Sequence, residues 1–191
     1  MSRRIFRGPL ALALLLSGSA LATVVVTLSI EEMAASVPLI VRGHVGQSQT
    51  RWDDQHRHIS TYTEVVVAES FKGHAPQVFL VREPGGVVGQ VGQFASGAPE
   101  FRPGEEVVLF LTPAVDEPAV FQCFAMAAGK VTLEESPMGG RRAVRHLDGL
   151  AEYQRAKNGP PRVTEVGNES LGSADLFLSR VRAAAAKQVT P

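Results

Sequence analysis

Asp53, His56 and His58 form the one cluster in this sequence whose residue types and spacing suit a metal ion. Two histidines at positions i and i+2 of a strand lie on one face, and a carboxylate three residues earlier can complete a ligand set. The chemistry would be metal-dependent hydrolysis. The motif holds no third histidine, and the run Arg51–Arg57 is polar, which favours a solvated turn between two strands. The metal site stays the alternative interpretation.

Cys123 is the single cysteine, so the chain can form no intramolecular disulfide. Its neighbours Phe121, Phe124 and Met126 are apolar, which predicts a buried thiol that packs as a small apolar residue. A nucleophilic cysteine would need an activating group such as histidine, and none lies nearby in the sequence. The thiol is therefore expected to be structural, with a reactive cysteine as the alternative.

A glycine-rich segment, Pro84–Gly97, includes Gly85, Gly86 and Gly89. It has neither the G-x-G-x-x-G pattern nor a G-K-S/T ending, and no helix is expected to follow and bind phosphate. The glycines are expected to serve backbone conformation, through positive φ or a close approach of strands. Glu105–Glu106 begins a strand and does not indicate an acid–base pair. We expect no cofactor.

The elements that must position these residues are mostly strands. Consecutive apolar residues at 107–111 indicate a strand that is buried on both faces. Gly129 is expected to kink the last strand where the sheet turns a corner. The Gly- and Pro-rich stretch 84–104 is expected to be irregular. The five predicted strands cover residues 39–45, 59–70, 78–81, 105–111 and 120–133.

Two helices flank the strands. Ser29 and Glu32 have the spacing of a capping box, which predicts a short helix over 30–36. Ser173 is expected to cap a helix over 174–187, whose apolar stripe must pack on a surface. The order of elements favours a mainly β protein, a small antiparallel five-stranded barrel with the C-terminal helix outside. The stripe consists of Leu176, Phe177, Val181 and Ala184.

The segment from Ser29 to Leu111 resembles a group of uncharacterised secreted bacterial proteins. More distantly, it is similar to the netrin and tissue-inhibitor-of-metalloproteinase module, which implies an OB-like barrel and an inhibitor-like or protease-associated protein. That module begins its mature chain with a cysteine that chelates zinc, whereas this chain would begin with Thr23, whose free amine could still ligate a metal. The motifs that carry the first resemblance are Leu39-Ile-Val-Arg-Gly-His-Val45, Trp52-Asp53, Ile59-Ser-Thr-Tyr-Thr-Glu-Val-Val-Val67, Lys72-Gly73, Pro84-Gly-Gly-Val-Val-Gly89 and Phe101-Arg-Pro-Gly-Glu-Glu-Val-Val-Leu-Phe-Leu111.

The first 22 residues have the anatomy of a bacterial secretory signal peptide. Three arginines precede the apolar run Pro9–Leu16, and Ala20-Leu21-Ala22 has small residues where a signal peptidase cleaves. The run is shorter than the roughly 20 residues of a membrane span. Arg3-Arg4 also fits the twin-arginine export pattern, with ordinary Sec export favoured. We therefore expect a periplasmic or extracellular protein with no membrane span after cleavage.

The sequence divides into a signal peptide (1–22), an OB-like barrel domain (23–134), an irregular connector (135–172) and a C-terminal helix and tail (173–191). The full chain has 19 basic and 19 acidic residues. Cleavage removes three arginines and no acid, which leaves 16 basic against 19 acidic residues and a formal charge of −3. This balance, with one Trp and two Tyr, does not suit a nucleic-acid binder.

Two functions follow from these observations. The leading one is a non-catalytic exported module that binds another exported protein, such as a protease. The other is a small metal-dependent hydrolase that uses His56 and His58. The expected recognition surface is the segment Pro84–Pro103 with the Trp52 turn and the new N-terminus, because binding residues concentrate on loops held by a rigid scaffold. Trp52 is either an interface anchor or a residue that packs over the barrel end.

Overall fold

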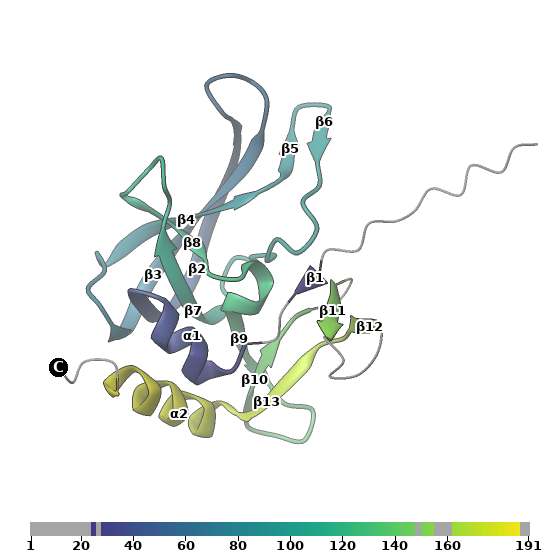
Figure 1. Cartoon of the computed structure of the whole chain (residues 1–191). Coiled ribbons are helices and arrows are strands. Elements are labelled where there is room, and N and C mark those ends of the chain that lie inside the picture. Colours follow the sequence, from purple (N-terminus) through teal and green to yellow (C-terminus); the bar gives the residue numbers. More distant parts are fainter. Residues whose placement is uncertain (1–23, 26–27, 148–149, 155–161, 188–191) are drawn as a thin grey trace, which may run out of the picture.

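The computed structural model describes residues 24–25, 28–147, 150–154 and 162–187 (Figure 1). Its main sheet contains a closed ring of five strands in the order β2-β3-β4-β8-β7, because β7 pairs with both β2 and β8. Closure gives each strand of the ring a partner on both sides, so the ring has no unpaired edge strand of the kind an open sheet would have. The ring strands are β2 (Leu39–Trp52), β3 (Ile59–Lys72), β4 (Val78–Pro84), β7 (Glu106–Pro113) and β8 (Val120–Cys123).

The expected mainly β fold with a five-stranded closure and two flanking helices is confirmed, but the expectation of antiparallel pairing throughout is wrong. The β4–β8 pair is parallel, with Leu80 opposite Val120, whereas the other four pairs in the ring are antiparallel. The reason is geometric. Strand directions cannot alternate all the way around a ring with an odd number of members, so at least one pair must be parallel.

The predicted fifth strand, 120–133, is split in two. Its halves, β8 and β9 (Lys130–Glu135), both pair antiparallel with the same edge of β7. Leu111 pairs with Cys123 and Leu109 pairs with Lys130. A step of two residues along β7 therefore matches a step of seven residues from β8 to β9. The extra residues form a bulge with a 3₁₀ turn, Met126–Gly129. The bulge lets β8 close the ring while β9 continues the sheet outside it.

The segment 135–172, expected to be an irregular connector, instead extends the main sheet. From β7 the sheet continues in the order β9, β10 (Arg141–Arg145), β13 (Glu169–Ser173). The segment is polar because one face of this extension is exposed to water. On that face, the partly exposed Arg141 and Arg142 pair with Glu106 and Glu134. A second small sheet contains β1 (Val24–Val25), β11 (Leu150–Gln154) and β12 (Arg162–Val166).

The two predicted helices are present and lie side by side against the outer face of the sheet (Figure 1). Helix α1 (Ile30–Ser36) begins with the predicted capping box, in which Ser29 and Glu32 bond each other's backbone N–H. Helix α2 (Ala174–Ala186) begins at Ser173, as expected. The prediction that Leu176 belongs to the apolar stripe is wrong, because its side chain is exposed and Leu178 is buried instead.

The described residues form two large hydrophobic cores and a third, smaller cluster that includes Ala128 and Leu147. The outer core lies between the helices and the face of β2, β7, β9 and β10, and it includes Phe110 and Phe177. The inner core fills the ring. Strand β7 contributes to both, with Val108 and Phe110 outward and Val107, Leu109 and Leu111 inward, which confirms the strand buried on both faces. Within the described ranges, no helix has the length and apolar character needed to cross a bilayer.

Candidate functional site: the covered mouth of the ring

The inner core of the ring ends in a polar layer at one end, which we call the ring mouth. Along β4 the inward positions are Phe79, Val81 and Glu83, and all three are buried. Glu83 pairs with Thr61 of β3, and Thr63 is buried beside them. A carboxylate and hydroxyls therefore replace apolar side chains at the level where the ring opens.

Hydroxyl groups connect β2 and β3 along this layer. Ser48 Oγ lies 2.9 Å from Thr63 Oγ1, and Thr50 Oγ1 lies 3.2 Å from Thr61 Oγ1. Thr61 donates its own proton to the carbonyl oxygen of Gly85 at 2.8 Å. Because its single proton is used there, Thr61 presents only acceptor lone pairs to other groups.

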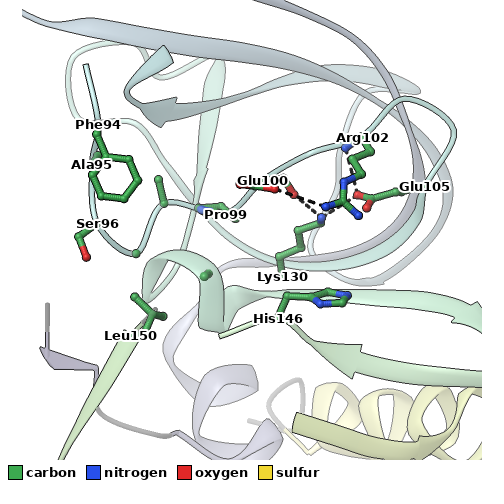
Figure 2. Close-up of a pocket in the computed structure, with 13 residues that line it drawn as sticks. Phe94, Ala95, Ser96, Pro99, Glu100, Arg102, Glu105, Lys130, His146 and Leu150 are labelled. Carbon is green, nitrogen blue, oxygen red and sulfur yellow. Dashed lines mark hydrogen bonds and ion pairs between the residues drawn. The ribbon is translucent and has the colours of Figure 1, made fainter. Parts of the chain in front are cut away.

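The segment 94–105, which we call the mouth loop, crosses the ring mouth. Phe101 packs against the inner core, and the buried Lys130 of β9 holds the loop from below (Figure 2). Lys130 Nζ donates to the carbonyl oxygen of Glu100 and to Glu105 Oε2, the latter at 2.7 Å. The ammonium also lies 5.0 Å from the centre of the Phe101 ring. The buried Lys130 ammonium therefore fixes the mouth loop at two points, Glu100 and Glu105.

A cavity lies on each side of the mouth loop. The first, of about 350 Å³, is the one drawn in Figure 2; Phe94, Lys130, His146 and Leu150 are among its lining residues. The second, the ring-mouth cavity, measures about 590 Å³ and lies between the loop, the hydroxyl layer and Glu83. Both cavities are lined by residues of the mouth loop, but Ser96 and Gly97 line only the first and Phe101 lines only the second. The loop residues that line both are Phe94, Ala95, Ala98, Pro99, Glu100 and Arg102.

A small hairpin directly precedes the mouth loop in the chain and lies next to the end of the β2–β3 hairpin (Figure 1). It consists of β5 (Gly86–Val88) and β6 (Val91–Gln93), which the sequence did not predict. Gly86 has φ of 127°, and a Cβ there would lie 2.5 Å from the side chains of Thr50 and Thr61. The expectation that these glycines serve close approach and positive φ is confirmed, because Gly85 and Gly89 also have positive φ.

The structure brings two of the three expected recognition segments together. Ile59, opposite Trp52 at the end of the β2–β3 hairpin, donates its N–H to Gln93 and accepts the N–H of Gly85. Trp52 itself is half-buried and its ring stacks on His56, with centroids 6.1 Å apart. The third segment, the new N-terminus at Thr23, lies outside the described residues.

The histidine motif lies at a turn. Asp53 Oδ1 accepts the backbone N–H of Arg57 at 2.7 Å, and this bond holds the pKa of Asp53 below its usual value. His56 has a φ of 53°, which the turn requires. In the part of the chain that the structure describes, no group of three His, Cys, Asp or Glu side chains could hold a metal ion. Asp53, His56 and His58 are therefore not assembled into a metal site there, and Asp53 Oδ1 instead closes the turn.

Cys123 is buried on β8, as predicted, and its environment disfavours the thiolate. Burial raises the pKa of the Cys123 thiol well above its usual value, and the nearby Glu83 carboxylate raises it further. The thiol therefore stays protonated at neutral pH and is a poor nucleophile.

No protein-family model matches this chain, and a search of curated proteins found no relative.

Sequence reasoning missed Glu83 and Lys130 as members of this site, and it included Phe94 only as an unnamed member of the expected recognition segment Pro84–Pro103. For Glu83 a signal existed: it continues the inward positions of β4, where a carboxylate is unexpected, but the strand was predicted to end at residue 81. Lys130 occupies a buried position of β9 in the same way. Phe94 carried no signal, because a single aromatic residue in a glycine-rich segment does not reveal whether it faces the core or the solvent.

The buried carboxyl predicts an unusual pH dependence of stability. Burial raises the pKa of Glu83 from 4.5 to about 7, against the opposing bond from the Cys123 N–H. The folded state therefore holds this proton more tightly than the unfolded state. The stability that it contributes is complete below pH 4.5 and is lost as the pH rises through about 7, by roughly 3 kcal/mol.

We expect Glu83→Gln to abolish this loss, because glutamine accepts the Cys123 N–H without a charge. Urea denaturation of both proteins between pH 5 and pH 8 measures the difference in slope. Glu100→Gln is the matched control, since the Glu100 side chain at the loop rim is 85% exposed, and it should keep the wild-type slope. Parallel wild-type and Glu83→Gln curves would contradict the prediction.

Proposed function

We propose that this chain is an exported, non-catalytic module with an OB-like barrel, and that it binds another exported protein through the face around the ring mouth. The ring order β2-β3-β4-β8-β7 supports the barrel assignment. Export is supported by the arginines, the apolar run and Ala20-Leu21-Ala22. The resemblance to the netrin and tissue-inhibitor module makes a protease or a protease-associated protein the expected partner.

The observation that carries this proposal is the exposure of Phe94. Its side chain is 91% exposed although it lies at the edge of both cavities, in the segment that covers the ring mouth. Val87 and Val91 of the adjacent β5–β6 hairpin are also exposed. Large apolar side chains grouped on a projecting hairpin and loop are unfavourable in water unless another surface covers them.

The shape of this face suits a protein partner. The mouth loop is held by Lys130 from below and by the contact of Ile59 with Gln93 just before its start. Binding would therefore cost little conformational entropy in this loop. An exposed aromatic residue beside concave pockets is typical of the centre of a protein interface. Trp52, at the end of the neighbouring hairpin, would extend the same face.

Replacing Phe94 by serine should weaken partner binding by about 2 kcal/mol or more and leave the melting temperature unchanged, because Phe94 makes little contact with the core. Partners captured from the native exported fraction are identified with the wild-type chain, and their affinities are then measured with the variants.

Met138→Ser is the matched control for this experiment. Met138 is 96% exposed but lies on the β9–β10 turn, away from the ring mouth. The control should bind as the wild type does. If Phe94→Ser retains wild-type affinity for every captured protein, the proposed binding face is wrong.

A further inference from the structure

Glu83 is an acidic group buried at the floor of the ring-mouth cavity without a cationic partner. The residue is only 6% exposed, and it lines the cavity together with Thr61 and Thr63. Its Oε1 accepts the N–H of Cys123 at 2.8 Å. Among the residues that the structure describes, no arginine, lysine or histidine forms an ion pair with it. A buried carboxylate of this kind is costly unless a cation joins it.

The nearby cations are all engaged elsewhere. Arg82, the neighbour of Glu83 on β4, pairs with Asp116 and Glu117. Lys130 pairs with Glu105 beneath the mouth loop. At the rim Arg102 lies 3.5 Å from the carboxylate of Glu100. The charged lining of the cavity is therefore Glu83, Glu100 and Arg102, an excess of one negative charge when Glu83 is ionised.

The neutral groups around Glu83 also favour a hydrogen-bond donor. Thr61 uses its proton on Gly85, so its oxygen can accept another bond. Ser48 and Thr63 share one hydrogen bond between two hydroxyls, which leaves acceptor lone pairs on both oxygens. An ammonium group has three donors and no acceptor, and it matches a carboxylate flanked by such hydroxyls.

The upper walls of the cavity are apolar. Val87, Phe94, Pro99 and Phe101 line the way from the rim to the hydroxyl layer. An alkyl chain would contact these walls while its charged end reached the floor, as the long side chain of lysine does on other protein surfaces.

We propose that the ring-mouth cavity binds a lysine side chain of the partner, with its ammonium on Glu83 and the Thr61 and Thr63 hydroxyls and its alkyl stem between Phe101 and the β5–β6 hairpin. This inference rests on the proposed function, since it names what the binding face recognises.

The binding of an ammonium depends on pH in a defined direction. Glu83 must be ionised to pair with it, and the pKa of about 7 means that the ionised fraction rises from about one tenth at pH 6 to about nine tenths at pH 8. A lysine ammonium stays protonated over this range. Affinity should therefore increase roughly tenfold from pH 6 to pH 8. The other charged or titratable groups near Glu83 are Arg82 on the same strand, Glu100 and Arg102 at the rim, and the Cys123 thiol on β8. The raised pKa of the thiol keeps it protonated over this range.

The test uses the mature chain and a small probe, N-acetyl-lysine N-methylamide, in which both backbone ends are blocked. Its neutral analogue is N-acetyl-norleucine N-methylamide. Binding is followed by NMR through the methyl signals of Thr61 and Thr63. We expect the lysine probe to shift these signals, to bind at least tenfold more tightly than the norleucine probe, and to bind more tightly at pH 8 than at pH 6.

Glu83→Gln should reduce the affinity for the lysine probe at pH 8 at least tenfold. Glu135→Gln, which changes an exposed carboxylate on β9 outside the cavity lining, should change it less than threefold. Equal affinity of the two probes, an affinity independent of pH, or full binding by Glu83→Gln would each overturn the inference. If Glu83→Gln does not fold, the probe comparison and the pH series on the wild type decide. These outcomes are separate from the Phe94→Ser experiment, so the proposed function can stand if the lysine site fails.

Discussion

Replacing Lys130 by methionine should lower the free energy of unfolding by about 3 to 5 kcal/mol, because it leaves Glu105 mostly buried without its cation. The same change removes the donor to the Glu100 carbonyl and so frees the mouth loop. Chemical denaturation gives the loss of stability. Limited proteolysis should show cleavage between residues 94 and 105 that the wild-type protein resists.

A double variant separates the charge effect from packing. Lys130→Met with Glu105→Leu replaces the ion pair by two apolar side chains and should recover part of the lost stability. Arg102→Met is the control, because Arg102 is exposed and its pair with Glu100 is a surface ion pair worth at most about 1 kcal/mol. A loss below 1 kcal/mol for Lys130→Met would mean that the mouth loop is held by other contacts.

Gly129→Ala should destabilise the protein by about 3 kcal/mol or more. A Cβ at this position would lie 2.1 Å from the carbonyl oxygen of Phe124, a backbone atom that no side-chain rotation can move away. The bulge between β8 and β9 is already tight, since Ala125 and Met126 have φ of 55° and 56°. Relief of the clash would shift β8 and open the contact with β4 that closes the ring.

Gly167→Ala is the matched control, because a Cβ there meets no atom within 4 Å and the backbone does not have positive φ. Its stability should stay within about 0.5 kcal/mol of the wild type. Thermal unfolding of the two variants makes the comparison. Equal stability of Gly129→Ala and Gly167→Ala would show that the bulge is adaptable and does not fix the ring.

The proposed function explains why polar side chains occupy buried positions at the ring mouth. An apolar layer there would be more stable than Glu83, Thr61 and Thr63, because each buried polar group must be satisfied. Retaining a carboxyl with a pKa of about 7 lowers stability at neutral pH and gives the cavity a charge. A group that reduces stability while it lines a cavity is typical of a binding site.

The sequence by itself determined the elements whose signals are local. Ser29 and Glu32 lie one helical turn apart, so the capping box could be predicted without knowing what α1 packs against. The run 107–111 predicted a strand buried on both faces, because five consecutive apolar residues leave neither face of a strand polar. The glycines 85, 86 and 89 indicated special backbone geometry, which their positive φ angles confirm.

The tertiary structure alone decided which strands meet. The run 120–133 has one continuous strand pattern, and only its pairing with two parts of β7 and with β4 separates β8 from β9. The same holds for the site, where Glu83, Lys130 and Phe94 come from three separate segments and gather at one end of the ring. A side-chain period reports which face of a strand is buried, whereas the identity of its partners depends on contacts between segments that lie far apart in the chain.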